Sequence, residues 1–140
     1  MSKGHGRVQR RLLQILGSQN RSVETFVLAA AVFDVPPGPD GVCRLTDTQI
    51  TATRGALQRL AREGSIIDLG YGGRRKVWAS ERVGLPLKIR AMQNENLVIA
   101  SGRDRERALE ILDRRLDEMR PLIKRATELG IMPGQQPASI

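Results

Sequence analysis

The sequence predicts a mainly α-helical fold that contains one small β-hairpin and ends in further helices. Apolar residues recur at helical spacing over most of the 140 positions, and a strand-like pattern replaces this spacing only between residues 65 and 79. The hydrophobic content of 40% and the charged content of 27% are typical of a folded chain. We expect a first domain over residues 1–80, a helical region over 81–130 and a disordered tail over 131–140.

The first predicted helix, residues 7–16, separates apolar from basic side chains. At 100° per residue its apolar side chains share one face: Val8, Leu12, Ile15 and Leu16. Its basic side chains share the other face: Arg7, Arg10 and Arg11. This basic face is either solvated or in contact with phosphate, and residues 17–20 end the helix with turn residues.

The second predicted helix begins with Ser22 as its N-cap and runs to Phe33. Its apolar residues point in every direction, so we expect it to be buried on most sides and to act as scaffold. Residues 34–41 follow, with three prolines and two glycines, and this composition predicts a loop. Residues 42–45 are expected to form a short extended piece.

The third predicted helix, residues 46–63, carries the strongest pattern. Thr46 and Gln49 are spaced as a capping box, and Gly64 marks the end of the helix. The side chains expected to face the core are Ile50, Thr53, Leu57, Leu60 and Ala61.

The opposite face of the 46–63 helix combines small, hydrogen-bonding and basic residues and contains no acid. Its members are Thr48, Thr51, Ala52, Gly55, Gln58, Arg59 and Arg62. Small side chains allow a helix to approach bases closely, glutamine pairs with adenine and arginine pairs with guanine. The pattern therefore favours binding in a DNA major groove; the alternative is an ordinary solvated face.

A β-hairpin is predicted directly after this helix. Residues 65–69 and 74–79 are the candidate strands, and residues 70–73, with Tyr71, form the tip. A basic triplet adjoins this tip: Arg74, Arg75 and Lys76. The triplet either contacts the phosphate backbone or minor groove, or keeps an edge strand soluble. Trp78 is expected to anchor the hairpin in the core.

Three helices followed by a basic hairpin make residues 7–80 resemble the winged helix-turn-helix family. The resemblance rests on residues 45–47, on residues 55–64 and on the hairpin through Trp78, and it includes MarR-type and PadR-type regulators. It implies that residues 46–63 are the recognition helix and that residues 70–75 are the tip of the wing. The connection from Phe33 to Thr46 is longer than the turn of a standard helix-turn-helix. Winged helices also serve as protein-interaction modules, so function is a separate question.

The last 60 residues are predicted to be helical after a linker at 81–86. A helix over 87–99 would place Leu87, Ala91, Asn94 and Val98 on one stripe. The segment from Arg103 carries apolar residues spaced 3, 4, 3, 4 and 3 apart: Leu109, Leu112, Leu116, Met119, Ile123 and Ala126.

This second segment carries two further predictions. Pro121 is expected to kink or restart the helix. The apolar seam either packs on the first domain or forms a homodimer, as the appended helices of PadR-like regulators do. The candidate dimerisation residues are Leu109, Leu112, Leu116, Met119 and Ile123.

The positive charge is concentrated in the first domain. The net charge of the chain is +8, with 12 Lys and Arg against 6 Asp and Glu in residues 1–80, and 11 against 9 in residues 81–140. Arginine, which forms forked contacts with phosphate and guanine, accounts for 19 of the 23 basic residues. The distribution indicates a polyanionic partner for the first domain.

Other classes of function find little support. A single cysteine, Cys43, and a single histidine, His5, exclude an intramolecular disulfide and a Cys/His zinc site. We expect no cofactor, no metal and no catalytic activity, since no constellation of reactive side chains is present. Residues 70–73 lack the strand–loop–helix order of a dinucleotide-binding loop. The chain has no long apolar run and a polar start, so we expect a cytoplasmic protein without membrane contact.

The leading hypothesis is a sequence-specific double-stranded DNA-binding protein, specifically a dimeric transcriptional regulator. The residues expected to face bases are Thr51, Gln58, Arg59 and Arg62; the hairpin triplet and the first helix would contact phosphates. One alternative is DNA binding in plasmid partition, replication or excision. Another is a winged domain that binds an acidic protein.

Overall fold

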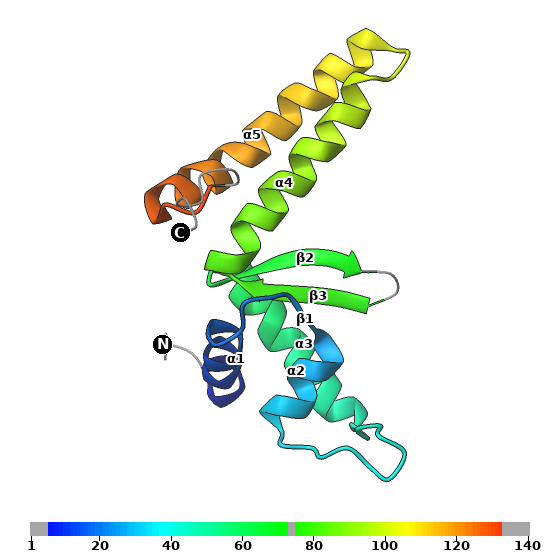
Figure 1. Cartoon of the computed structure of the whole chain (residues 1–140), viewed down its shortest axis with the longest axis vertical. Coiled ribbons are helices and arrows are strands. Elements are labelled where there is room, and N and C mark those ends of the chain that lie inside the picture. Colours follow the sequence, from blue (N-terminus) through cyan, green and yellow to red (C-terminus); the bar gives the residue numbers. More distant parts are fainter. Residues whose placement is uncertain (1–5, 73–74, 133–140) are drawn as a thin grey trace, which may run out of the picture. The chain divides into compact units, whose positions relative to one another are not determined.

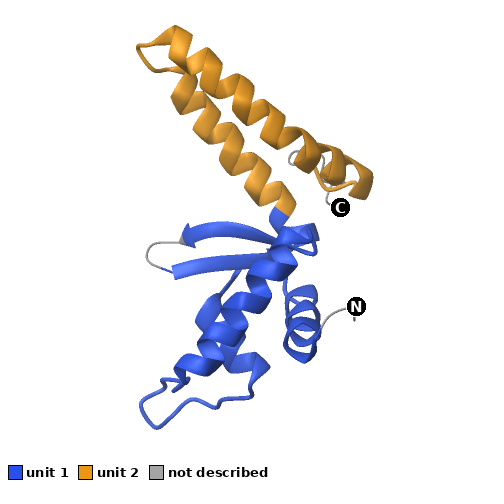
Figure 2. Cartoon of the chain, turned by 180° about the vertical axis from the view of Figure 1, so that it is seen from behind, with its two compact units in different colours: residues 1–84 blue, residues 85–140 orange. Residues whose placement is uncertain are grey.

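The structure, a computed structural model, describes residues 6–72 and 75–132 (Figure 1). The chain divides after Gly84 into two compact units, residues 1–84 and residues 85–140 (Figure 2). Within the described residues the fold is mainly helical with one small antiparallel sheet. This confirms the predicted class as a mainly α-helical fold with a small β-structure.

The first unit holds three helices and a sheet. In chain order its elements are α1 (Arg7–Gly17), β1 (Val23–Glu24), α2 (Thr25–Val32), α3 (Asp47–Arg62), β2 (Ile66–Gly72) and β3 (Arg75–Ser80). The predicted faces of α1 are confirmed, because Leu12 and Leu16 are buried while Arg7, Arg10 and Arg11 are exposed. The core is built from Leu12, Leu16, Val23, Leu28, Leu57, Leu60, Ile66 and Trp78.

The sheet has three strands in the order β1-β3-β2, one strand more than the sequence predicted. Val23 pairs with Trp78, and Glu24 pairs with Val77. The prediction that Ser22 caps the second helix was therefore wrong: the backbone at 23–24 is extended and α2 begins at Thr25, with Glu24 as its N-cap. Pairing with β3 buries Val23, and this tertiary contact outweighs the local capping signal.

The prediction for α3 is confirmed in detail. The backbone N–H of Gln49 donates to Thr46 Oγ1 at 3.1 Å, and the N–H of Thr46 donates to Gln49 Oε1 at 3.0 Å. These two bonds satisfy donors that the first turn of a helix leaves free. At the other end Gly64 adopts φ +80°, a conformation that glycine adopts without strain. The capping box and the glycine thus define the length of α3.

The predicted linker at 81–86 is wrong, because α4 (Glu81–Ala100) begins immediately after β3 and includes Pro86. The glycine in this segment is a packing residue rather than a helix breaker. A Cβ atom at Gly84 would lie 2.5 Å from Cβ of Ile67, so only glycine lets the first turns of α4 approach β2 so closely.

The second unit contains the rest of α4 and α5 (Arg105–Leu129), which lie side by side and antiparallel (Figures 1 and 2). Asn96 joins them: its Oδ1 accepts from Arg115 Nε at 2.6 Å and its Nδ2 donates to Met119 Sδ at 3.2 Å. Arg115 also pairs with Glu95 at 2.6 Å. Of the two outcomes predicted for Pro121, a kink or a restart of the helix, the restart is wrong, since α5 continues through this exposed position.

None of the helices in the described part of the chain has the length and apolar character needed to cross a membrane. The predicted disordered tail falls largely on residues 133–140, which lie outside the described residues.

Candidate nucleic-acid interface

The predicted outer face of α3 is exposed along its whole length. Its seven residues are all exposed: Thr48, Thr51, Ala52, Gly55, Gln58, Arg59 and Arg62. The opposite side of α3 is held in the core by Thr53, Leu57 and Leu60, each of which is fully buried. Because this side fixes the rotation of the helix about its axis, the acid-free face must point to solvent.

The hairpin beside α3 has an irregular strand. Asp68 pairs with Trp78 and Tyr71 pairs with Lys76, so β2 contains one residue more than β3 between these pairs. Gly70 takes up the extra residue with φ +77°, and its N–H donates to Asp68 Oδ1 at 2.8 Å. Such a bulge bends and twists a hairpin locally. The bend precedes Tyr71, which the sequence had placed in a loop and which instead belongs to β2.

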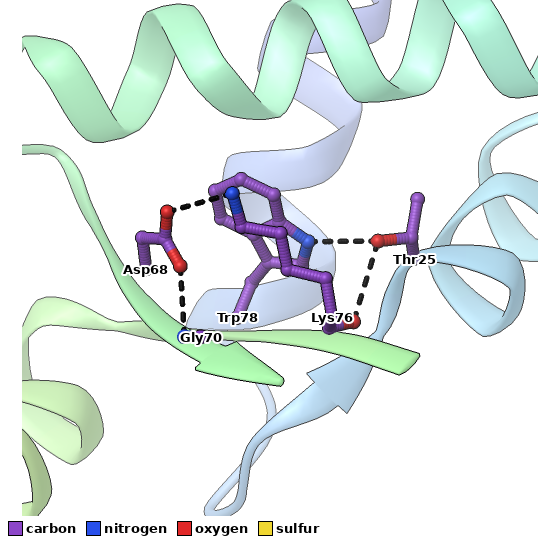
Figure 3. Close-up of polar contacts among 5 residues, drawn as sticks. All are labelled: Thr25, Asp68, Gly70, Lys76 and Trp78. Atoms are coloured by element: carbon purple, nitrogen blue, oxygen red, sulfur yellow. Dashed lines mark hydrogen bonds and ion pairs between the residues drawn. The ribbon is translucent and has the colours of Figure 1, made fainter. Parts of the chain in front are cut away.

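A polar network fixes the middle of this hairpin (Figure 3). Lys76 Nζ lies 2.9 Å from Asp68 Oδ2 and 4.8 Å from the centroid of the Trp78 ring. Thr25 Oγ1 accepts from Trp78 Nε1 at 2.9 Å and donates to the Lys76 carbonyl at 3.3 Å. The prediction that Trp78 anchors the core is confirmed, because this side chain is fully buried. The ammonium of Lys76 therefore already forms an ion pair within the chain.

A depression of about 370 Å³ opens between the start of α2, the side of α3 and the hairpin. Its lining residues are Thr25, Phe26, Arg54, Gln58, Tyr71, Arg75 and Lys76. It therefore brings together four residues that the sequence had assigned separately to the helix and the hairpin. Arg59 and Arg62 lie on the same exposed helix but outside the depression.

The three basic side chains that line the depression differ in whether they form an ion pair with a carboxylate. Arg75 pairs with Glu24 at 2.9 Å, and Lys76 pairs with Asp68. Arg54 has no carboxylate partner among the described residues. Of the three described basic side chains that line the depression, Arg54 is therefore the one whose charge is not offset by an ion pair.

Arg54 was missed in the sequence because of its position on the helical wheel. It lies on the border between the core stripe and the outer face, one turn before Gln58. Its charge was the available signal, since the long side chain of a border arginine reaches out of the core. Thr25 and Phe26, which also line the depression, were missed as well. Phe26 was expected to be buried in scaffold and is instead exposed.

The remaining predicted contact residues lie elsewhere. Figure 1 places α1, with Arg7, Arg10 and Arg11, on the side of the first unit away from the end of the hairpin. Arg11 lies 3.4 Å from Asp34, in an open hollow of its own between α1 and the end of α2. Arg74 lies outside the described residues.

The predicted dimerisation residues of α5 are divided between two environments. Met119 is buried against α4, and Leu112 and Ile123 are half-buried. Leu109 and Leu116 are exposed. Met119 thus packs on α4 of its own unit, an arrangement that was not among the two alternatives drawn from the sequence, while Leu109 and Leu116 stay exposed.

The described residues hold no cluster of three or more His, Cys, Asp or Glu side chains that could bind a metal. Cys43 is a half-buried free thiol, and His5 lies outside the described residues. Comparisons with models of protein families, with curated protein sequences and with solved structures find no match.

Proposed function

We propose that the chain is a sequence-specific double-stranded DNA-binding protein and that its first unit works as a winged helix-turn-helix domain. In this proposal α3 enters the major groove as the recognition helix. The β2–β3 hairpin is the wing and contacts the adjacent backbone or minor groove. The biological role that we propose is transcriptional regulation as a homodimer.

The observation that carries the proposal is the depression between α3 and the hairpin. Two surfaces that the sequence marks separately as basic, the helix face and the strand pair, border one concave site. A phosphate backbone that passes between a groove-bound helix and a wing needs such a concavity with cations on both walls. Arg54 supplies the cation on the helix wall, and Arg75 supplies it on the hairpin wall.

The residues divide by role in this proposal. Thr51, Gln58, Arg59 and Arg62 face the bases, because small neighbours at positions 52 and 55 allow α3 to approach them. Arg54 and Arg75 contact phosphates, which fixes register without reading sequence. Lys76 holds the hairpin through Asp68 and contributes charge at longer range.

Self-association belongs to the second unit in this proposal. Two antiparallel helices expose large apolar side chains on the faces that they do not turn to each other: Leu87, Leu97, Val98, Leu109, Leu116 and Leu129. Exposed apolar surface of this kind marks interaction sites. A dimer would present two recognition helices to two half-sites.

The test begins with selection of bound duplexes from a random-sequence library by the purified full chain. Fluorescence anisotropy then measures the affinity for the best duplex and for a scrambled one over a series of salt concentrations. We expect a selected consensus, a preference for it over the scrambled duplex, and a linear fall of log affinity with log salt. Absence of salt-dependent duplex binding would contradict the proposal and favour a winged module that binds an acidic protein.

A further inference from the structure

Two faces of α4 carry apolar residues at heptad spacing, and only one of them has a partner in the second unit. The face toward α5 contains Met92, Asn96 and Ile99, which are half-buried, and Asn96 contacts α5 directly. The opposite face contains four exposed residues spaced 4, 3 and 4 apart: Leu87, Ala91, Asn94 and Val98. We refer to these four residues as the α4 stripe.

The α4 stripe is an uncharged face that exposes apolar side chains to water. At 100° per residue its members fall within about 60° of one another and roughly opposite the residues that face α5. Leu87 is 47% exposed and Val98 is 73% exposed, while none of the four residues is charged. Leu97, at its margin, is 71% exposed. The spacing of 4, 3 and 4 residues is that of the a and d positions of a coiled-coil helix.

We propose that a second copy of this chain covers the α4 stripe, with the two α4 helices packed antiparallel across a two-fold axis between Ala91 and Asn94. This inference rests on the self-association proposed above and names the face and direction that mediate it. The antiparallel arrangement sets Leu87 opposite Val98 of the second copy. It also sets Ala91 opposite Asn94, so that the small alanine leaves space for the amide.

Charge complementarity supports the antiparallel direction. Lys88 and Glu95 flank the α4 stripe on the same side, seven residues apart, and an antiparallel pair places each opposite the other in the second copy. Lys88 has no carboxylate partner among the described residues. Glu95 binds Arg115 yet keeps its side chain 61% exposed, so it can accept a second cation. Two such pairs form for each dimer.

The margin on the other side of the stripe also fits this direction. An antiparallel pair sets Leu97 beside the aliphatic stem of Arg90 of the second copy, which covers the most exposed leucine of α4. A parallel pair would join Arg90 to Glu95 instead, leave Lys88 without an acid and carry Leu97 past the end of the partner helix. The antiparallel arrangement therefore covers more apolar surface than the parallel one and, unlike it, gives Lys88 an acidic partner.

Sedimentation equilibrium of the full chain without DNA tests the interface. We expect the wild type to dimerise and Lys88→Glu to weaken the dimer by about tenfold or more, since it places like charges opposite each other twice. Lys124→Glu on α5, an exposed lysine outside the proposed interface, is the matched control, with the same substitution and little effect expected. Circular dichroism confirms that each variant stays helical. A monomeric wild type, or a larger effect of Lys124→Glu than of Lys88→Glu, would overturn the proposal.

Disulfide cross-linking in a Cys43→Ser background tests the direction of packing. Cysteines form a disulfide only when their Cα atoms come within about 7 Å. We expect Ala91→Cys and Asn94→Cys chains to cross-link when mixed, whereas Leu87→Cys chains do not, because eleven residues of offset separate these positions by about 16 Å. Cross-linking of Leu87→Cys with itself would indicate a parallel pair. Cross-linking of Leu116→Cys, without the mixed product, would place the interface on α5.

These outcomes are separable from those for DNA binding. A chain that stays monomeric but selects a duplex would refute the α4 interface and leave the proposed function standing. A chain that dimerises through the α4 stripe but binds no duplex would refute the proposed function and leave the α4 interface standing.

Discussion

The indole Nε1 of Trp78 donates a hydrogen bond to Oγ1 of Thr25 at 2.9 Å, across 53 positions of the chain. Both side chains are buried, and the same hydroxyl donates to the carbonyl of Lys76. A single threonine at the start of α2 therefore satisfies the only polar atom of the tryptophan side chain and also holds β3. The contact links the helical layer to the hairpin at the point where the candidate interface begins.

Replacement of Thr25 by valine is expected to destabilise the first unit. Valine keeps the shape of threonine but leaves the buried indole N–H without an acceptor, which costs about 1–3 kcal/mol. Urea unfolding followed by the fluorescence of Trp78, the only tryptophan of the chain, measures this loss in the first unit. Thr25→Ser is the control, because it keeps the acceptor. A valine variant as stable as the serine variant would contradict the role assigned to this bond.

Gly84 supports a second prediction about stability. A Cβ atom at this position would lie 2.5 Å from Cβ of Ile67 on β2, closer than packed carbons approach each other. We expect Gly84→Ala to destabilise the first unit by about 1–3 kcal/mol through overpacking. Thermal and urea unfolding, again followed by tryptophan fluorescence, are the measurements.

Gly55→Ala is the matched control for this glycine. Gly55 lies in the middle of α3, and a Cβ atom added there meets no atom within 4 Å. Since alanine favours a helix interior over glycine, we expect this variant to gain about 0.5–1 kcal/mol. The two substitutions should thus shift the urea midpoint in opposite directions, and equal shifts would refute the packing argument.

The elements with strong local signals were predictable from the sequence. The limits of α3 follow from Thr46, Gln49 and Gly64, because a capping box and a terminal glycine act within a few residues of the chain. The buried position of Trp78 was likewise predictable, since the largest apolar side chain of a small hairpin has nowhere else to pack.

The wrong predictions concern segments whose structure depends on contacts with residues distant in the sequence. Strand β1 forms because Val23 can pair with Trp78, and nothing near Ser22 announces that pairing. Glycine and proline usually interrupt helices, so Gly84 and Pro86 were predicted to lie in a linker. In the folded chain Gly84 lies within α4, where the close contact with Ile67 leaves no room for a Cβ atom. For the same reason the sequence marked basic residues of α3 and of the hairpin but not the depression that Arg54 and Arg75 both line.

Arg54 and Arg75 should contribute to affinity without reading sequence. If each contacts a phosphate, replacement by alanine lowers the slope of log affinity against log salt by about one and weakens all duplexes alike. Anisotropy titrations over a range of salt concentrations, with the selected and the scrambled duplex, give both quantities. Arg120→Ala removes the same charge from the second unit and should leave the slope unchanged. An unchanged slope for Arg54→Ala would remove this residue from the interface.

Arg59 and Arg62 should instead determine which sequence is bound. Both are exposed on the acid-free face of α3, and a forked contact with guanine discriminates against other bases. Alanine at either position is expected to cost about 1–3 kcal/mol on the selected duplex and much less on the scrambled one, so the preference between them narrows. Both positions lie in the last turn of α3, where a cation also stabilises the helix. Lysine variants separate these effects, since lysine keeps the charge but loses the fork. A double alanine variant that binds the selected duplex as tightly as the wild type would show that α3 is not the recognition helix.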